Sequence, residues 1–343
     1  MKLASIEFIR GLAVSLVVVY HLYAVQDRYL EVNHLPGLFQ LGGSGVDMFF
    51  VISGVVMYKT LYCRPNAHNI WSFLSARVTR IYPPYWVITI VIYFIAWLDP
   101  TLVNSSYDQQ PSLLKSLLLL PDVTNPWLNV GWSLVFEIWF YLLLGVLLVF
   151  PQKVVCIILL IYACFLLFYD NLHQLSPFII LISDPLILEF ISGFALGLMY
   201  FRVKNHNKKF ILISFILIPL TFLAVFAAIE ISISDNSIER IILFGLPAVS
   251  IVAFGLYFDD FFSQNLIFKP MIYIGKISYS VYLTHVLALN AFLFGSFRIL
   301  KLEISPIVAN IACFLFVIIF GSIYYIVIER PSTRAMVKFL SKS

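Results

Sequence analysis

The sequence predicts an all-α integral membrane protein with about ten transmembrane helices. Of the 343 residues, 61% are hydrophobic and only 12% are charged, about half the charged share of an ordinary soluble domain. The mean hydropathy is +0.95, and apolar runs of about twenty residues recur along the chain. A chain this apolar is excluded from the class of soluble globular proteins.

The predicted spans are apolar windows bounded by polar residues, Pro or Gly. Together they form a single transmembrane domain over residues 1–343 with its core at about 4–330, and no internal repeat is visible. The first run has no small-residue cleavage pattern, so we expect it to remain as a span. The windows are Ile6–Val25, Val46–Leu61, Ile81–Leu98, Trp132–Phe150, Val154–Tyr169, Pro185–Phe201, Phe210–Ile229, Ile238–Phe258, Met271–Phe294 and Pro306–Ile328.

The basic residues predict how the chain is oriented. With the N-terminus inside, seventeen of the 22 Lys and Arg residues fall on the cytoplasmic side of these spans. An even number of spans then puts the C-terminus inside as well. We therefore predict an N-in, C-in, multi-pass protein of the inner (cytoplasmic) membrane, in contact with membrane lipids. The basic residues left outside are Arg28, Lys115, Arg240, Arg298 and Lys301.

Two ionisable residues, Arg10 and His21, lie inside the first span. Eleven residues are about three helical turns, so the two side chains are roughly 16 Å apart along one face. Ionisable groups at membrane depth cost a few kcal/mol each, which favours a functional site over chance. The spacing predicts a long ligand that is charged at one end and reactive at the other.

A pair of arginines marks the predicted inner end of the third span. Arg77 and Arg80 are three residues apart and share one helical face, just before Pro83 and Pro84. Guanidinium groups bind phosphate oxygens bidentately, so these two together with Arg10 would suit a nucleotide pyrophosphate. The alternative is that Arg77 and Arg80 only anchor the span on its positive side.

Two carboxylates are predicted on the outer half of the membrane, at the depth of His21. Asp47 opens the second span and Glu137 lies just over a turn into the fourth. A carboxylate beside a histidine holds its tautomer and raises its basicity. The alternative is that each acid caps a helix N-terminus, where negative charge is favoured in any case.

The ninth span carries a polar stripe. Tyr279, Tyr282 and His285 fall on roughly one side of this helix. With Trp132 they are candidate substrate-binding residues; the alternative is a buried histidine that is hydrogen-bonded to a tyrosine for packing. No two cysteines share a ligand spacing, so no metal site is predicted. A nucleic acid is not predicted as a partner either.

Two further features concern helix packing and the longest loop. Glu189 opens the sixth span ahead of Gly193 and Gly197, a small-xxx-small pattern that predicts close helix packing. The longest outer loop, residues 99–126, is polar and contains three prolines. It is interpreted either as a rim that binds an acceptor or as an exposed connector.

Five sequence blocks cover nearly the whole chain, namely Arg10 through His21, Gly45–Gly54, Arg77–Pro83, Trp132–Glu137 and Ile277–His285. In this order they resemble the blocks of the membrane-bound acyltransferase 3 family. The second block and the compact length are similar to the branch that decorates exopolysaccharides with acetyl groups. In the fourth block, Ile138 follows Glu137 where the commonest family form has a second acid, which puts a paired carboxylate there in doubt.

The resemblance implies an acyl-CoA donor, usually acetyl-CoA, and a sugar hydroxyl of a cell-surface or lipid-linked polysaccharide as acceptor. Arg10, Arg77 and Arg80 would then hold the CoA phosphates. His21, oriented by Asp47 or Glu137, would take the proton of the acceptor hydroxyl or would itself accept the acyl group. The resemblance also implies that this chain lacks the extracytoplasmic hydrolase-like domain of some members.

Two rival functions remain at this point. A transporter or flippase for a lipid-linked glycan also has many spans and midplane charges, but no repeated halves are visible here. An acyltransferase of another membrane family, acting on lipids or proteins, also uses an intramembrane histidine but lacks the arginine three turns before it. The sugar, the size of the acyl group and the oligomeric state are not predicted.

Overall fold

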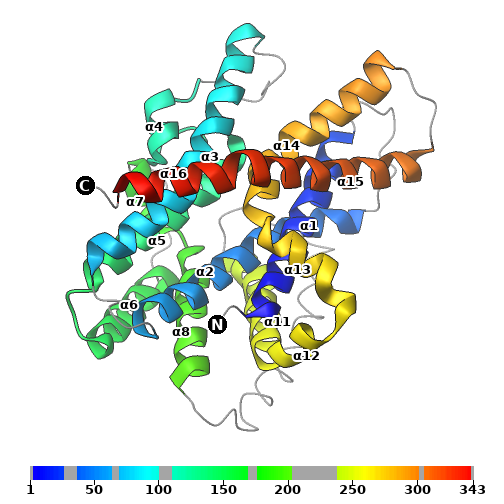
Figure 1. Cartoon of the computed structure of the whole chain (residues 1–343). Helices are drawn as coiled ribbons and strands as arrows, with labels where there is room; N and C mark the ends of the chain where they lie inside the picture. Colours follow the sequence, from blue (N-terminus) through cyan, green and yellow to red (C-terminus); the bar gives the residue numbers. More distant parts are fainter. Residues whose placement is uncertain are drawn as a thin grey trace. The chain divides into compact units, whose positions relative to one another are not determined.

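The computed structural model describes residues 3–26, 37–63, 69–99, 110–168, 176–202, 238–300 and 305–340. All elements in these ranges are helical, and they contain no strand (Figure 1). Eight of the described helices are long and apolar enough to cross a membrane. The predicted all-α membrane class is confirmed.

Short helical turns interrupt or extend several of these helices. The elements are α1 (Ala4–Gln26), η1 (Gly37–Ser44), α2 (Gly45–Tyr62), α3 (Ile70–Leu98), α4 (Leu113–Leu118), η3 (Asn129–Gly131), α5 (Trp132–Leu147), α6 (Gln152–Phe168), α7 (Pro177–Ser183), α8 (Ile187–Arg202), α10 (Ile238–Arg240), η4 (Ile241–Gly245), α11 (Leu246–Tyr257), α12 (Asp259–Gln264), η5 (Leu266–Phe268), α13 (Lys269–Lys276), α14 (Ser278–Leu293), η6 (Phe294–Ile299), α15 (Pro306–Tyr324), η7 (Tyr325–Glu329) and α16 (Arg330–Leu340).

The eight long helices correspond to eight of the predicted spans. The predicted span Val154–Tyr169 corresponds to a shorter apolar helix, Gln152–Leu167. The predicted span Phe210–Ile229 lies outside the described residues. The orientation of the termini stays a prediction.

The predicted start of the third span at Ile81 is wrong. Helix α3 begins eleven residues earlier, at Ile70, because the side chain of Asn69 accepts hydrogen bonds from the first amides of the helix. Pro83 and Pro84 lie inside α3. Arg77 and Arg80 are therefore helical residues of α3 itself.

The contacts divide the chain into two compact units, which are described separately. Unit 1 is Met1–Tyr58 with Glu189–Tyr324, and unit 2 is Lys59–Leu188 with Tyr325–Ser343. The prediction of a single transmembrane domain is not tested by this division.

Helix α1 is the centre of unit 1, and it packs against α11, α12, α13 and α14. Helix α13 lies directly along it (Figure 1). This approach depends on glycine, because a Cβ added at Gly11 would collide with the carbonyl oxygen of Met271, and one at Gly275 with that of Glu7. The backbones of α1 and α13 are thus in direct contact.

Helices α2 and α8 cross in the same way. A Cβ at Gly193 would collide with the backbone of Val51, and one at Gly54 would collide with the backbone of Phe190. A Cβ at Gly197 would come within 2.8 Å of the Tyr58 side chain. The small-residue packing face predicted at Gly193 and Gly197 is confirmed.

In unit 2, the described part of the loop 99–126, residues 110–126, folds back along α3. Tyr82, Tyr85 and Trp86, near the middle of α3, donate hydrogen bonds of 2.8–3.0 Å to carbonyl oxygens of α4. The acceptors are the last carbonyls of α4, which have no partner within that helix. Ser116 and Leu119 are buried in this packing, whereas Leu114 and Val123 are exposed. Both interpretations of this loop, a rim that binds an acceptor or an exposed connector, stay predictions.

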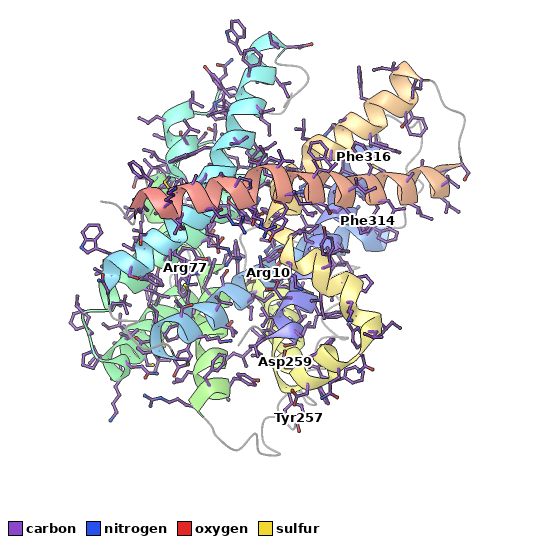
Figure 2. The ribbon with its side chains drawn as sticks, viewed as in Figure 1. Arg10, Arg77, Tyr257, Asp259, Phe314 and Phe316 are labelled. Atoms are coloured by element: carbon purple, nitrogen blue, oxygen red, sulfur yellow. The ribbon has the colours of Figure 1, made fainter. Side chains whose placement is uncertain are left out.

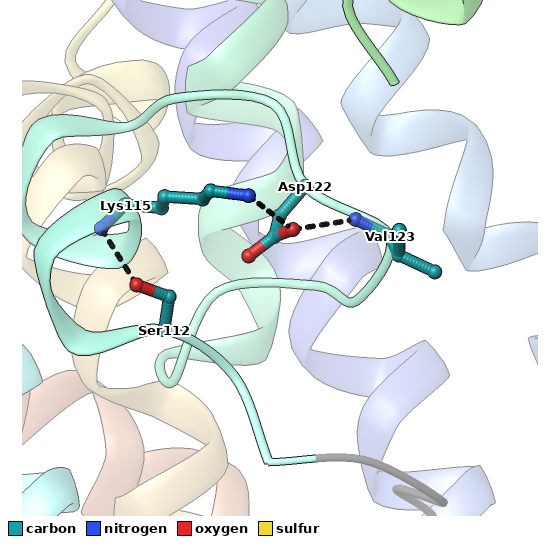
Figure 3. Close-up of polar contacts among 4 residues, drawn as sticks. All are labelled: Ser112, Lys115, Asp122 and Val123. Carbon is teal, nitrogen blue, oxygen red and sulfur yellow. Dashed lines mark hydrogen bonds and ion pairs between the residues drawn. The ribbon is translucent and has the colours of Figure 1, made fainter. Parts of the chain in front are cut away.

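Asp122 closes the turn that follows α4 (Figure 3). Its Oδ1 accepts from Lys115 Nζ at 2.8 Å and from the backbone amide of Val123 at 2.9 Å. The hydroxyl of Ser112 caps α4 by accepting from the Lys115 amide at 3.4 Å. These local bonds fix the conformation of the returning segment.

Candidate functional site

Helix α1 carries two of the predicted site residues, and its N-terminal end is anchored to α12. Asp259 Oδ1 accepts from the amide and the hydroxyl of Ser5 at 2.8 and 2.7 Å. A carboxylate is favoured there by the free amides and the dipole of the helix. Figure 2 shows Asp259 and Arg10 within unit 1. Arg10 forms an ion pair with Glu7, one turn earlier, at 3.5 Å.

His21 and His285 form a hydrogen-bonded pair. His285 Nε2 lies 3.2 Å from His21 Nδ1, across 264 residues of sequence, and the two rings meet edge to face with centroids 4.7 Å apart. The second nitrogen of His285, Nδ1, lies 2.7 Å from the carbonyl oxygen of Tyr282. His285 is fully buried, whereas His21 keeps part of its surface exposed. The structure thus joins the C-terminal part of α1 to the middle of α14.

Asp47 is bound by a different partner from the one predicted. Arg240 donates a hydrogen bond to each carboxylate oxygen of Asp47, from Nε to Oδ1 at 3.2 Å and from Nη2 to Oδ2 at 2.9 Å. Glu189, at the start of α8, interacts with Asp47, and its carboxyl packs against Gly245. Asp47, Glu189 and Arg240 are all buried, and we refer to these three residues as the Asp47 group.

This arrangement corrects the expectation that Asp47 orients His21. Within the described residues no hydrogen bond or ion pair joins Asp47 to His21. The reason is electrostatic, because a buried carboxylate is most stable beside a guanidinium fork that satisfies both of its oxygens. The alternative of a simple helix cap for Asp47 is also too narrow, since the partner lies 193 residues away.

In unit 2, Arg77 is buried between aromatic rings. Its guanidinium lies 5.5 Å from the ring centroids of both Phe73 and Tyr141, and Nη2 donates to the hydroxyl of Thr60 at 3.1 Å. Arg77 is only 9% exposed, whereas Arg80, one turn further along α3, is exposed. The two arginines that look equivalent in sequence therefore have different surroundings.

Glu137 lies on α5, in the same unit as Arg77 and Arg80. It accepts a hydrogen bond from the hydroxyl of Tyr141, one turn later in α5, and Tyr141 interacts electrostatically with Arg77 and Arg80. Helix α5 begins near the middle of α3, where Gly131 meets Tyr85. The outer depth expected for Glu137 stays a prediction. Whether Glu137 orients His21 stays a prediction, since the two residues belong to different units.

The remaining predicted site residues are aromatic. Tyr282 is buried, and its ring lies 6.0 Å from that of Phe49. Tyr279 is half-buried on the same helix, and Trp132 at the start of α5 packs edge to face on Phe136. Their role in binding a substrate stays a prediction.

Arg240, Tyr141 and Thr60 were missed as site residues in the sequence, and Glu189 was assigned only to packing. A signal for Arg240 was present, because it opens one apolar span on the side where Asp47 opens another. Opposite charges at the same predicted depth are a reason to expect a pair. Neither Tyr141 nor Thr60 differs visibly from the many other polar residues in the apolar spans.

The fold and the site define a class of protein first. This is a multi-pass membrane protein whose apolar helices bury histidine, arginine and carboxylate side chains, as membrane enzymes and transporters do. A family model that is described as an acyltransferase domain matches residues 3–326, nearly the whole chain. The chain therefore belongs to the acyltransferase 3 family.

Two curated relatives are informative. The exopolysaccharide production protein ExoZ of Rhizobium meliloti is 28% identical over 315 residues, which cover 86% of this chain and 91% of that protein. The O-acetyltransferase OatA of Staphylococcus aureus is 25% identical over 319 residues, which cover 82% of this chain but only 50% of that protein. No solved structure matches the chain.

Proposed function

We propose that this protein is an O-acyltransferase of the cytoplasmic membrane that moves an acetyl or small acyl group from cytosolic acyl-CoA to a hydroxyl of a cell-surface or lipid-linked polysaccharide. The family supplies the reaction class. The printed names of ExoZ and OatA point to an exopolysaccharide and to O-acetylation. The main structural support for the proposed reaction is that His21 is partly exposed and that its Nδ1 is hydrogen-bonded within unit 1.

In this proposal His21 acts through Nε2. The acceptor hydroxyl loses its proton to Nε2 while its oxygen bonds to the thioester carbonyl carbon. The carbon–sulfur bond then breaks, and the CoA thiolate leaves and takes the proton from the imidazolium as a thiol. A positioned base of this kind contributes roughly 10²- to 10⁴-fold to the rate.

A second route uses the same nitrogen as a nucleophile. His21 Nε2 would bond to the acyl carbon, release CoA and pass the acyl group to the acceptor in a second step. Single-turnover labelling separates the two routes. A trapped acyl-imidazole supports the second route, and ternary-complex kinetics support direct transfer.

The arginines are the proposed ligands of the donor phosphates. Guanidinium forks match phosphate oxygens in shape and charge. Arg80 has the exposed side chain that a ligand requires, while Arg77 is bonded to Thr60 and Arg10 to Glu7. The roles of Arg10 and Arg77 in this proposal rest on the sequence blocks.

The test uses the full chain in liposomes with labelled acetyl-CoA and de-acetylated exopolysaccharide of the source organism. We expect label to appear on the polysaccharide in proportion to protein. Mass spectrometry of surface polysaccharides from cells with and without the protein gives the matching result in vivo. Movement of a lipid-linked glycan across the vesicle membrane without any acyl transfer would instead support the transporter function.

A further inference from the structure

The hydrogen bonds of the histidine pair determine where its protons lie. A carbonyl oxygen only accepts, so His285 Nδ1, at 2.7 Å from the Tyr282 oxygen, carries a proton. A neutral imidazole has one such proton, which leaves a lone pair on His285 Nε2. That lone pair faces His21 Nδ1 at 3.2 Å, so His21 Nδ1 must be the donor.

A second contact of His21 requires the same tautomer. Its Nδ1 lies 2.9 Å from the carbonyl oxygen of Val17, one turn earlier in α1. Both neighbours of Nδ1 are acceptors, and each calls for a proton on that nitrogen. The proton of a neutral His21 is therefore on Nδ1, and the lone pair is on Nε2. Within the described residues Nε2 has no hydrogen bond.

We propose that His285 is a positioning residue that fixes His21 as the Nδ1–H tautomer and so makes Nε2 the atom that takes the acceptor proton. This inference rests on the proposed function and adds a residue to it. When Nε2 gains the proton, the His21 imidazolium donates from Nδ1 to the His285 lone pair. A hydrogen bond from a charged donor is stronger than one from a neutral donor, so His285 stabilises the charge as it forms.

This role replaces the substrate-binding role expected for His285. Both of its ring nitrogens are already bonded, one to the Tyr282 carbonyl and one to His21. The side chain is also fully buried on α14. His285 thus has no free nitrogen for a sugar hydroxyl, and it acts on the substrate only through His21.

The first test compares two amides at position 285. In His285→Gln the amide oxygen reaches the place of Nε2 and still accepts from His21, whereas in His285→Asn the shorter amide reaches only the place of Nδ1. We expect His285→Asn to lower kcat roughly 10- to 100-fold, a large part of the contribution of a positioned base, with the donor KM unchanged. His285→Gln should keep most of the wild-type kcat.

Equal kcat values for the two variants, at equal unfolding temperatures, would overturn the proposal. A parallel rise of donor KM in both variants would do the same, because it would indicate a general disturbance of the site. The comparison is matched, since both variants remove the imidazole and keep a neutral amide.

The second test measures the tautomer without any reaction. Nitrogen-15 NMR of histidine-labelled full-length protein, with the His21 signal assigned from its loss in His21→Ala, is expected to show a protonated Nδ1 and an unprotonated Nε2. In His285→Ala the His21 signals should shift toward a mixture of tautomers. A wild-type His21 with its proton on Nε2 would overturn the inference even if acyl transfer is observed, and absent acyl transfer would overturn the proposed function alone.

Discussion

The Asp47 group and the histidine pair both lie among the helices of unit 1, yet their hydrogen bonds are arranged differently. Arg240 occupies both carboxylate oxygens of Asp47, and all three residues of the group are buried. In the histidine pair, three of the four ring nitrogens are bonded, and the fourth, His21 Nε2, has no partner within the described residues.

The difference separates a structural group from a chemical one. A buried carboxylate whose two oxygens are both bonded to a guanidinium stabilises one packing of its helices and has no free oxygen for a ligand. A histidine with one nitrogen fixed and the other free is oriented for proton transfer. The same contrast recurs within unit 2, where Arg77 is buried and Arg80 is exposed.

The largest change in stability is expected when the Asp47 group loses its cation. Arg240→Met leaves Asp47 and Glu189 buried without a counter-ion, and breaking a buried pair in this way costs about 3–5 kcal/mol. Thermal unfolding of the detergent-purified protein measures this loss. Asp47→Asn should cost less, because the amide oxygen of Asn can still accept a hydrogen bond from Arg240.

The matched control for this prediction is Arg334→Met, which removes an exposed arginine on α16. It should unfold at the wild-type temperature. If Arg240→Met did so as well, the Asp47 group would not be the structural group described here.

The next largest effect is expected where α13 contacts α1. Gly275→Ala introduces a methyl group against the Glu7 carbonyl, and overpacking of this kind typically costs about 1–3 kcal/mol. Because Glu7 pairs with Arg10, the donor KM should also rise. Gly295→Ala is the control, since no atom lies within 4 Å of its added Cβ. Equal unfolding temperatures for the two variants would contradict the close packing.

The buried Arg77 and the exposed Arg80 of α3 provide a matching comparison within unit 2. Arg80→Ala should raise the donor KM about tenfold, because a hydrogen bond to a charged group is worth about 1.5–3 kcal/mol, while the unfolding temperature stays unchanged. Arg77→Ala should lower the unfolding temperature, since Arg77 is bonded to Thr60 and packed against Tyr141. An unchanged donor KM in Arg80→Ala would leave that residue as a topological anchor.

The smallest effect is expected at Asp122, whose bonds are local. Partial burial acts to raise the pKa of this carboxyl, but the bonds from Lys115 and the Val123 amide outweigh it and hold the pKa below its ordinary value of 3.8. The contribution of the Asp122 carboxylate to the stability of this segment is therefore complete above pH 3.8. It is lost as the pH falls through the lower pKa of the folded state.

Hydrogen exchange of the amides in residues 112–123 measures this effect. Protection should fall in acid for the wild-type protein, whereas in Asp122→Asn it should be low and independent of pH. Protection that rises on acidification would contradict the sign of the pKa shift.

Much of the fold was predictable because it follows from apolar length alone. Eight of the predicted spans are long helices, and the packing face at Gly193 is where the pattern predicted it. The start of α3 was not predicted, because the continuous apolar run begins only at Ile81 and the cap at Asn69 was overlooked. The return of the loop along α3 depends on Tyr82, Tyr85 and Trp86, whose bonds to α4 leave no periodic signal.

The site was predictable residue by residue but not pair by pair. The sequence singled out His21, Asp47 and His285 as polar residues in apolar spans. It paired His21 with a carboxylate, since depth along a span was the only coordinate available. Which side chains meet depends on how the helices are rotated and packed, and the partners of His21 and Asp47 lie 264 and 193 residues away.

The central claim is that His21 carries the chemistry of this membrane protein. The most direct measurement is the initial rate of acyl transfer from labelled acetyl-CoA by purified His21→Ala beside the wild-type protein, at saturating donor. We predict a loss of at least about 10²-fold with the unfolding temperature and the donor KM unchanged. A His21→Ala protein that transfers the label at the wild-type rate would contradict the account.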